Sequence, residues 1–326
     1  MRWRSLLCAV ALAACGPSAA DAPIAEQWRA VTLTATPVDF GAERIGALRF
    51  RGGLHLAADN HDLFGGLSGL DVLEDGRLIA VSDYGEWFEA TLVLADDGAL
   101  VGVADARAAL LRDERGEPFE DKAAGDSEGL TQLPDGRFAV SFEQTQTIRI
   151  YDLNRDGPFG VAQAGPRLAR TQSLPDNVGL EALAVTSEGA LLVGAEGGGR
   201  RTTPLWIAPI TAAAPVARAT RYRPASGYSL TSLDRLPSGG FVALERFFAP
   251  VLGARARITR FSEDALGGEE ISAEELALIS PPLTLDNFEG VAAVRMSDGV
   301  TRLYIVSDDN FSDRQRTLLL AFDIVE

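Results

Sequence analysis

Residues 126–143 read DSEGLTQLPDGRFAVSFE, two apolar runs joined by a turn that contains Asp135-Gly136. An Asp-Gly pair between two such runs is a strong short-range signal for a β-hairpin. If these two residues form the whole turn, Glu128 lies directly opposite Glu143. Like charges that face each other in an antiparallel pair are destabilising. We therefore expect something outside the hairpin to compensate for them.

This hairpin occurs five times along the chain. Each copy has an apolar strand, a turn that contains glycine and a second apolar strand that ends in Asp or Glu. The copies are LSGLDVLEDGRLIAVSD (67–83), SEGLTQLPDGRFAVSFE (127–143), LEALAVTSEGALLVGAE (180–196), LTSLDRLPSGGFVALE (230–245) and FEGVAAVRMSDGVTRLYIVSD (288–308). Weaker strand pairs separate the copies, so four strands recur over roughly 45–60 residues, which is typical of a β-propeller blade.

The repeat predicts an all-β chain, folded as a β-propeller with five four-stranded blades over residues 41–326. Six blades are the alternative, if the segment 85–125 contains a degenerate blade. Only one strand, RTLLLAFDIV (316–325), follows the fifth hairpin. We expect the N-terminal stretch GALRFRGGLHL (46–56) to pair with it and close the ring.

The acidic residues at the ends of the hairpins are predicted to converge. In a propeller the innermost strand of each blade begins, and the second strand ends, at the same mouth of the central channel. The acidic residues at these positions are Asp83, Glu128, Glu143, Glu181, Glu196, Glu245, Glu289 and Asp308. Two carboxylates about 6 Å apart repel each other by roughly 3 kcal/mol at an effective dielectric constant of about 20. Several such pairs require protonation or a bound cation.

We expect this cation to be Ca²⁺, with Mg²⁺ as the second choice, because loosely arranged oxygen ligands suit calcium best. Zinc is disfavoured, because it prefers histidine and thiolate ligands. The chain has only two histidines, His55 and His61, and its two cysteines, Cys8 and Cys15, lie in the N-terminal segment. The alternative is that the acidic residues only mark strand ends on a solvated face.

The formal net charge of −16 argues against nucleic acid as a partner, because phosphate backbones are bound by clustered Lys and Arg. We expect a small anionic or ester substrate and a monomeric protein. The loops after the second strands contain arginines that could bind an anion at the mouth, since guanidinium groups suit phosphate oxygens. These are Arg200, Arg201, Arg246, Arg314 and Arg316. The alternative for each of them is an ordinary surface arginine.

The repeated sequences DSEGL, GLEAL and NFEGV, with SDYG and SDDN at the ends of two hairpins, resemble the phytase-like family of bacterial exported proteins, which is described as having esterase-like activity. The resemblance covers approximately residues 45–326. It implies that Glu128, Glu181 and Glu289, at the repeated E-G or E-A position, are metal-binding or catalytic residues. Ser68 and Thr231 depart from this pattern, which argues against a complete five-fold ring of ligands.

The resemblance also implies a Ca²⁺-dependent esterase, because the family is named after β-propeller phytases, which hydrolyse phosphomonoesters with Ca²⁺ at the channel mouth. We favour phosphoesters as substrates. The metal would polarise the ester and lower the pKa of a bound water, and one carboxylate would be the general base. The alternatives are a Ca²⁺-dependent lactonase and a non-catalytic binding platform with a structural ion, since a fold alone does not determine a function.

The first residues, MRWRSLLCAVALAACGPSAADAP, combine a basic start, a short apolar run and small residues, as in an export signal. Leu12-Ala13-Ala14-Cys15 resembles the lipobox of bacterial lipoproteins. We therefore expect a lipoprotein signal peptide over residues 1–15, a lipid on Cys15 and a tether over residues 16–40. The alternative is a plain signal peptide that is cleaved nearby. Gly16 after the cysteine favours the outer membrane of the cell envelope, with the lipid as the only membrane attachment.

Replacing Cys15 by serine tests the lipobox. Because the variant has no thiol to accept the lipid, the lipoprotein signal peptidase should leave Cys15→Ser unprocessed, or the chain should leave the membrane if another peptidase cleaves it. Labelling with a radioactive fatty acid and membrane fractionation measure the two effects. Unchanged lipid labelling of the variant would contradict the assignment.

Overall fold

The computed structural model describes residues 28–58, 64–171, 174, 178–197 and 200–325. The predicted signal peptide with Cys15, and residues 16–27 of the predicted tether, lie outside the described residues. Within the described ranges, no helix is both long enough and apolar enough to cross a bilayer.

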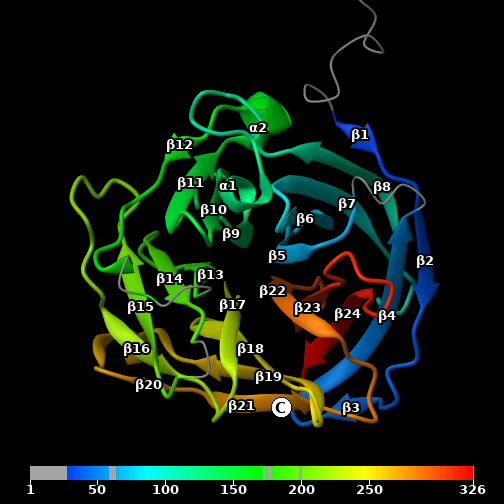
Figure 1. Cartoon of the computed structure of the whole chain (residues 1–326). Helices are drawn as coiled ribbons and strands as arrows, with labels where there is room; N and C mark the ends of the chain where they lie inside the picture. The colour runs from blue at the N-terminus through cyan, green and yellow to red at the C-terminus, as the bar shows by residue number, and fades with distance from the viewer. Residues whose placement is uncertain (1–27, 59–63, 172–173, 175–177, 198–199, 326) are drawn as a thin grey trace, which may run out of the picture.

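Five antiparallel sheets are arranged in a ring around a central channel (Figure 1), so the prediction of a five-bladed β-propeller is confirmed. Blade 1 contains β5 (Leu67–Val72), β6 (Arg77–Ser82), β7 (Glu86–Leu94), β8 (Leu100–Leu110) and β1 (Arg29–Ala30). Blade 2 contains β9 (Ser127–Gln132), β10 (Phe138–Phe142), β11 (Thr147–Tyr151) and β12 (Gln163–Ala164). Blade 3 contains β13 (Leu180–Val185), β14 (Leu191–Ala195), β15 (Thr203–Ala208), β16 (Thr220–Arg223) and β20 (Ile271–Ser272).

Blade 4 contains β17 (Ser229–Arg235), β18 (Phe241–Ala249), β19 (Gly253–Phe261) and β21 (Glu274–Ile279). Blade 5 contains β22 (Asn287–Arg295), β23 (Thr301–Asp308), β24 (Thr317–Ile324), β4 (Leu48–Ala58) and β2 (Leu33–Pro37), with β3 (Arg44–Ile45) paired to β4. The short helices are α1 (Lys122–Gly125), α2 (Leu153–Asp156) and the 3₁₀ turns η4 (Gly157–Phe159) and η6 (Glu263–Gly267). The segment 85–125 forms β7, β8 and α1, so the six-blade alternative is wrong.

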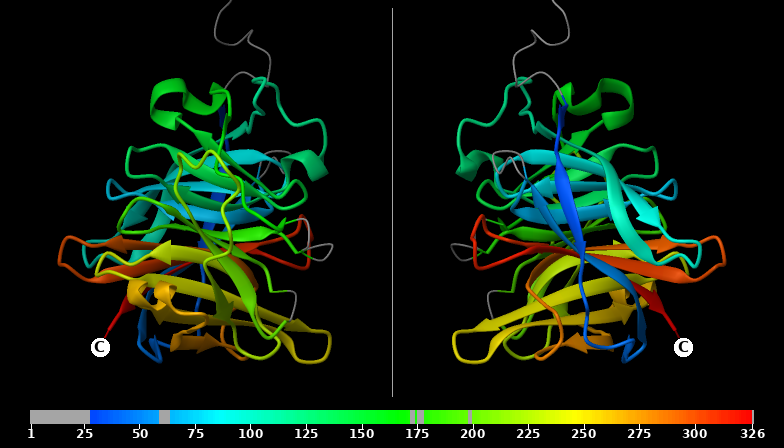
Figure 2. Two further views of the ribbon diagram at one scale, coloured as in Figure 1. Left: turned by 90° about the vertical axis from the view of Figure 1, so that its left-hand side faces the viewer. Right: turned by 90° about the vertical axis from the view of Figure 1, so that its right-hand side faces the viewer.

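The N-terminal strand closes the ring as predicted. Strand β4 pairs antiparallel with β24, so that Leu54 lies opposite Leu319. Strand β2 adds outside β4, and β1 pairs with β8 of blade 1. Figure 2 shows these N-terminal strands in blue along the outside of the ring. Residues 29–30 and 33–37 therefore form strands, although the predicted tether extends to residue 40, because Val31, Leu33 and Ala35 pack on the core between blades 5 and 1.

The register of the inner hairpins differs from the prediction by one residue. The amide of Leu133 donates to the carbonyl of Arg137, and Gly136 has φ +84°, so the turn is a three-residue loop with a left-handed glycine. Leu130 then lies opposite Val140, and a β-bulge follows between Val140 and Phe142. As a result Glu143 lies opposite Asp126, whose carbonyl accepts from the Glu143 amide, and not opposite Glu128.

The same bulge occurs at the same place in all five inner hairpins. A bulge inserts one residue that has no partner across the ladder, and it redirects that side chain. The five bulged residues are Ser68, Glu128, Glu181, Thr231 and Glu289.

Apolar side chains fill the spaces between neighbouring blades. One cluster joins Ala80 and Phe88 of blade 1 to Val306 and Leu319 of blade 5. Another joins Val81 and Trp87 of blade 1 to Val140 and Phe142 of blade 2. The blades therefore pack face to face through buried apolar surface, which leaves their inner strands close together at the channel.

The glycine after the bulged residue permits this close approach in three blades. A Cβ atom on Gly129 would lie 2.5 Å from the carbonyl oxygen of Glu181 in the next blade. A Cβ on Gly69 would lie 2.6 Å from the carbonyl of Glu128, and one on Gly290 would lie 3.0 Å from that of Ser68. The small residue thus lets the backbones of two bulges approach each other.

Substituting Gly129 by alanine should destabilise the ring. The new methyl group meets backbone atoms, which cannot rotate away, and overpacking of this kind costs about 1–3 kcal/mol. Gly102→Ala is the control, because its Cβ would meet only Val93 Cβ, at 3.6 Å, and surface changes usually stay within about 0.5 kcal/mol. Urea unfolding of the two variants measures the difference, and equal losses of stability would contradict the close approach.

Candidate functional site

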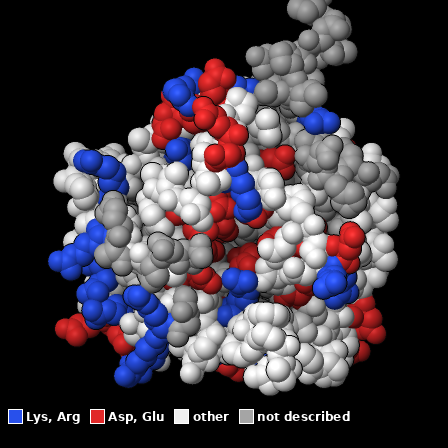
Figure 3. All heavy atoms as spheres, in the orientation of Figure 1, with Lys and Arg blue, Asp and Glu red and all other residues white. Residues whose placement is uncertain are grey.

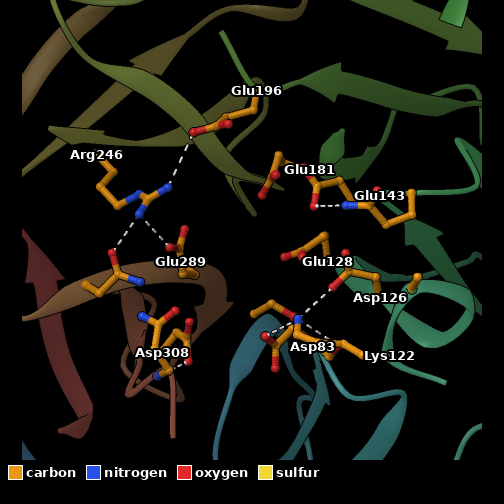
Figure 4. Close-up of a pocket in the computed structure, with 15 residues that line it drawn as sticks. Asp83, Lys122, Asp126, Glu128, Glu143, Glu181, Glu196, Arg246, Glu289 and Asp308 are labelled. Carbon is orange, nitrogen blue, oxygen red and sulfur yellow. Dashed lines mark hydrogen bonds and ion pairs between the residues drawn. The ribbon is translucent and has the colours of Figure 1, made fainter. Parts of the chain in front are cut away.

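One mouth of the channel contains a cavity of about 530 Å³ that is lined mainly by acidic side chains. Its carboxyl groups belong to Asp83, Asp126, Glu128, Glu143, Glu181, Glu196, Glu289 and Asp308. Among the described residues, only two cationic side chains, Lys122 and Arg246, line the same cavity. Figure 4 shows these residues pointing toward one another from several blades.

Two positions in each blade supply most of the charged groups. The first is the bulge, which is occupied by glutamate in blades 2, 3 and 5 and by Ser68 and Thr231 in blades 1 and 4. The second is the residue on the second strand, or directly after it, that lies opposite the position two residues before the bulge. These residues are Asp83, Glu143, Glu196, Arg246 and Asp308. The repeat therefore brings seven of the eight predicted metal-binding residues to one cavity.

Glu245 is the exception, and its prediction as a metal ligand at the mouth is wrong. Leu230 pairs with Glu245 and Ser229 with Arg246, so Arg246 occupies the position that carboxylates have in the other blades. Glu245 is fully buried. It accepts hydrogen bonds from the Tyr222 hydroxyl at 2.6 Å and from Arg257 Nη1 at 2.9 Å. Glu245 therefore forms a buried ion pair with Arg257 within blade 4, and its hydrogen bond from Tyr222 joins blade 4 to blade 3.

Arg246 is the only predicted substrate-binding arginine that lines the mouth cavity. Its guanidinium lies 3.3 Å from Glu196 Oε1 and 3.2 Å from Glu289 Oε1, and it donates to Asn287 Oδ1 at 2.8 Å. Arg200 and Arg201 line a different cavity on blade 3. Arg314 is exposed and does not line the mouth, and Arg316 is paired with Asp286.

Lys122 is a residue of the site that the sequence analysis does not include. Helix α1 carries it to the mouth, and the side chain of Asp121 caps that helix by accepting from the Ala124 amide. Lys122 Nζ lies 2.6 Å from Asp83 Oδ2 and 3.0 Å from Asp126 Oδ1. Burial lowers the pKa of this amine, but the two carboxylates outweigh burial and raise it. The sequence could have drawn attention to this residue, since Lys122 is the only lysine in the chain.

Glu128 and Glu181 lie between the two cations in Figure 4. Among the described residues, neither carboxyl group has an ion-pair or hydrogen-bond partner. Burial raises the pKa of Glu128 well above its usual range, and the charge of Glu181 adds to the effect. Burial and then the charge of Glu196 raise the pKa of Glu181 in the same way.

The outer carboxyl groups have raised pKa values as well. Burial raises the pKa of Glu289 to about 8, although the charge of Arg246 opposes the shift. Burial raises the pKa of Glu143 to about 7, with Asp126 as the next cause, and that of Asp308 to about 7. Several groups at this mouth are therefore poised to exchange protons near neutral pH.

The oxygen atoms at the mouth could hold a divalent cation. One oxygen from each of Asp126, Glu128 and Glu143 lies within 4.8 Å of the others. Asp83 Oδ1 and Glu289 Oε2 are buried and have no hydrogen-bond partner among the described residues. All these donors are hard carboxylate oxygens, so their chemistry suits Ca²⁺ or Mg²⁺.

An aromatic pair forms part of the rim. The rings of Tyr84 and Phe311 are 4.5 Å apart, and Lys122 Nζ lies 5.1 Å from the centre of the Tyr84 ring. Gly65 and Gly66 make room for Phe311, because a Cβ at either position would lie within 2.8 Å of its ring. The rim next to Asp83 and Asp308 is therefore apolar and aromatic.

The fold and the site define a β-propeller with a carboxylate-rich mouth, and comparison with known families agrees with this class. Residues 62–311 match the phytase-like family, described as "esterase-like activity of phytase". The chain belongs to this family. No curated protein sequence matches the chain significantly.

Several solved structures are similar in fold. One is a putative gluconolactonase, with 14% identity, a TM-score of 0.46 and coverage of 92% of this chain and 99% of that chain. A PQQ-bound aldose sugar dehydrogenase from Streptomyces coelicolor has 14% identity, a TM-score of 0.42 and coverage of 89% and 98%. A virginiamycin B lyase from Staphylococcus aureus has 9% identity, a TM-score of 0.41 and coverage of 89% and 99%.

The raised pKa values predict how stability depends on pH when no metal is bound. Some carboxyl groups have a higher pKa in the folded state than in the unfolded state. The stability that such a group contributes is fully present at a pH below its unfolded pKa, and it is lost as the pH rises through its folded pKa. For Glu143, Asp308 and Glu289 the folded values are about 7, 7 and 8. In the presence of a chelator, the melting temperature should therefore decrease as the pH is raised from about 5 to about 8.

Scanning calorimetry in EDTA across this range measures the effect. Glu128→Gln removes one of the repelling groups and should flatten the curve, whereas Glu188→Gln, at an exposed turn, should leave it unchanged. A wild-type midpoint that stays constant or rises over this range would contradict the electrostatic account.

Proposed function

We propose that this protein is a divalent-cation-dependent esterase that hydrolyses small anionic esters, with Ca²⁺ as the favoured ion and phosphoesters as the favoured substrates. The observation that carries the proposal is the mouth cavity, in which Glu128 and Glu181 lie between two cationic side chains and have no hydrogen-bond or ion-pair partner among the described residues. The description of the family as having esterase-like activity supports ester hydrolysis.

Asp126, Glu128 and Glu143 are the residues that would hold the ion, with Glu181 as a neighbouring ligand. When bound, Ca²⁺ would supply charge stabilisation to the ester oxygen and a lowered pKa to a coordinated water. Glu128 and Glu181, which have no hydrogen-bond or ion-pair partner among the described residues, have most to gain from a cation, whereas Asp126 already pairs with Lys122.

Lys122 and Arg246 would orient the anionic part of the substrate. They lie on opposite sides of Glu128 and Glu181 (Figure 4), so a bound anion would have a cation on either side. An arginine fork matches the oxygens of a phosphate group. These two positive charges favour an anionic ester over an uncharged lactone.

Glu289 is the residue that we assign to proton transfer. Its pKa of about 8 keeps most of the carboxyl group protonated at neutral pH and lies close enough to neutrality for a general acid or base. Arg246 fixes one oxygen at 3.2 Å, whereas Oε2 has no hydrogen-bond partner among the described residues. This buried oxygen therefore lacks a partner, and a substrate or water molecule that reached it would supply one.

Hydrolysis of a substrate panel tests this function. The panel contains a phosphomonoester, a phosphodiester, a carboxyl ester and a lactone, each with Ca²⁺, with Mg²⁺ and with EDTA. We expect Ca²⁺-dependent release of phosphate, reduced by about 10²-fold or more in Glu289→Gln because a positioned acid or base contributes that much. Glu188→Gln should retain full activity. Absence of hydrolysis of every ester with either ion would overturn the proposal.

Thermal unfolding with added Ca²⁺ separates an enzyme from a binding platform. Calcium should raise the wild-type midpoint by mass action on the folded state. Glu128→Gln should melt higher than wild type in EDTA, since one repelling charge is gone, and gain less from Ca²⁺. A calcium-dependent midpoint without any hydrolysis would indicate a structural ion, and a midpoint indifferent to Ca²⁺ and Mg²⁺ would exclude the metal site.

A further inference from the structure

A second cavity, of about 580 Å³, lies on blade 3 and has the opposite charge. Five arginines line it: Arg170, Arg200, Arg201, Arg218 and Arg221. None of the described residues that line it is acidic, and none of them lines the mouth cavity. Figure 3 shows basic side chains gathered on the left of this face, where β15 and β16 lie in Figure 1. Such a cluster stands out in a chain with 46 acidic and 30 basic residues.

The sheet of blade 3 sets the inner wall of this cavity. Arg221 of β16 lies directly opposite Pro204 of β15, and directly opposed residues project from the same face of a sheet. Trp206 follows two residues after Pro204, so it shares that face. The wall thus combines a guanidinium group with the apolar surfaces of Pro204 and Trp206.

The facing wall contains Ala169, Arg170 and Leu174, which precede β13, and Ala217 and Arg218, which precede β16. The Ala169 amide donates to the Val216 carbonyl at 2.7 Å, and the Val216 amide donates to the Arg167 carbonyl at 2.8 Å. Trp206 Nε1 donates to the Ala169 carbonyl at 3.3 Å. These bonds fix Arg170 and Arg218 at the same cavity, so the arginines converge through defined backbone contacts.

The guanidinium groups of Arg200, Arg201, Arg218 and Arg221 make no hydrogen bond or ion pair with any described residue. The neighbouring Arg223 differs, because it is paired with Glu270. These four like charges face one cavity in which no described lining residue is acidic, so they repel each other, and a bound anion would relieve that repulsion.

We propose that this cavity binds a small soluble molecule that carries two or more phosphate groups on a compact organic body. Several guanidinium forks can each bind phosphate oxygens through paired hydrogen bonds. The volume is within the range of small-molecule sites, and the surfaces of Pro204, Trp206 and Leu174 provide an apolar contact for the body of the ligand.

Binding of inorganic tripolyphosphate, measured by titration calorimetry, tests this site. The titration is done in EDTA, so that no divalent cation bridges the probe to the mouth. We expect one molecule per chain, and binding weakened about tenfold or more in Arg218→Gln/Arg221→Gln, because hydrogen bonds to charged groups contribute on this scale. Raising the salt concentration should weaken binding to the wild type.

Arg44→Gln/Arg49→Gln is the matched control, because it removes the same charge from two exposed arginines of blade 5 and should bind like wild type. Equal weakening in the control, citrate binding as tight as tripolyphosphate, or no binding would overturn the proposal. Binding to phosphatidylcholine vesicles that contain phosphatidic acid, without binding to tripolyphosphate, would also overturn the proposal, because the ligand would then be a lipid headgroup and not a small soluble molecule. Glu289→Gln should bind the probe normally, so the result does not depend on hydrolysis at the mouth.

Discussion

A β-bulge in the innermost strand of every blade decides where the chemistry of this protein lies. Without the bulge, strand alternation would place Glu128 on the same face as Leu130, and Leu130 is packed in the core between blades 1 and 2. Glu181 would similarly share a face with Leu183, and Leu183 is part of a buried cluster. The extra residue changes the alternation once, at the mouth, so the apolar side chains remain between the blades and the carboxyl groups face the channel.

This arrangement concentrates negative charge that the fold itself does not neutralise. Elsewhere in the channel the protein handles buried acids differently. Asp71 accepts a hydrogen bond from the Gln132 amide at 2.7 Å, and Asp234 accepts one from the Ala293 amide at 2.6 Å. Burial raises the pKa of Asp71 to about 6 even with this donor. The hydrogen bonds of these two acids join neighbouring blades. Glu128 and Glu181 at the mouth have no such donor among the described residues. This lack of a local donor is the observation on which the proposed cation site depends.

The sequence contains the repeat and the ring closure, because both depend on local patterns: apolar alternation, turns with glycine, and one strand left over at each end. It does not contain the register. Asp135-Gly136 fits a two-residue turn and a three-residue loop equally well, and the choice moves the partner of Glu143 from Glu128 to Ser127; the bulge then moves it by one more residue, to Asp126. The fourth hairpin shows the same limit, since aligning it on its last acidic residue selects Glu245 in place of Arg246. Lys122 reaches the mouth through α1, which packs there by tertiary contacts that no periodic pattern predicts.

Charge also sets the order of events at the mouth under the proposed function. The cavity combines eight carboxyl groups with two cationic side chains, and both cations are already paired with carboxylates. An anionic ester that approached the metal-free cavity would therefore meet net negative charge at short range, where screening by salt is weak. Once a bound cation neutralises the carboxylates, they no longer repel the ester. Lys122 and Arg246 can then exchange their contacts with carboxylates for contacts with the substrate. The same residues that destabilise the empty site thus make cation binding a precondition for substrate binding.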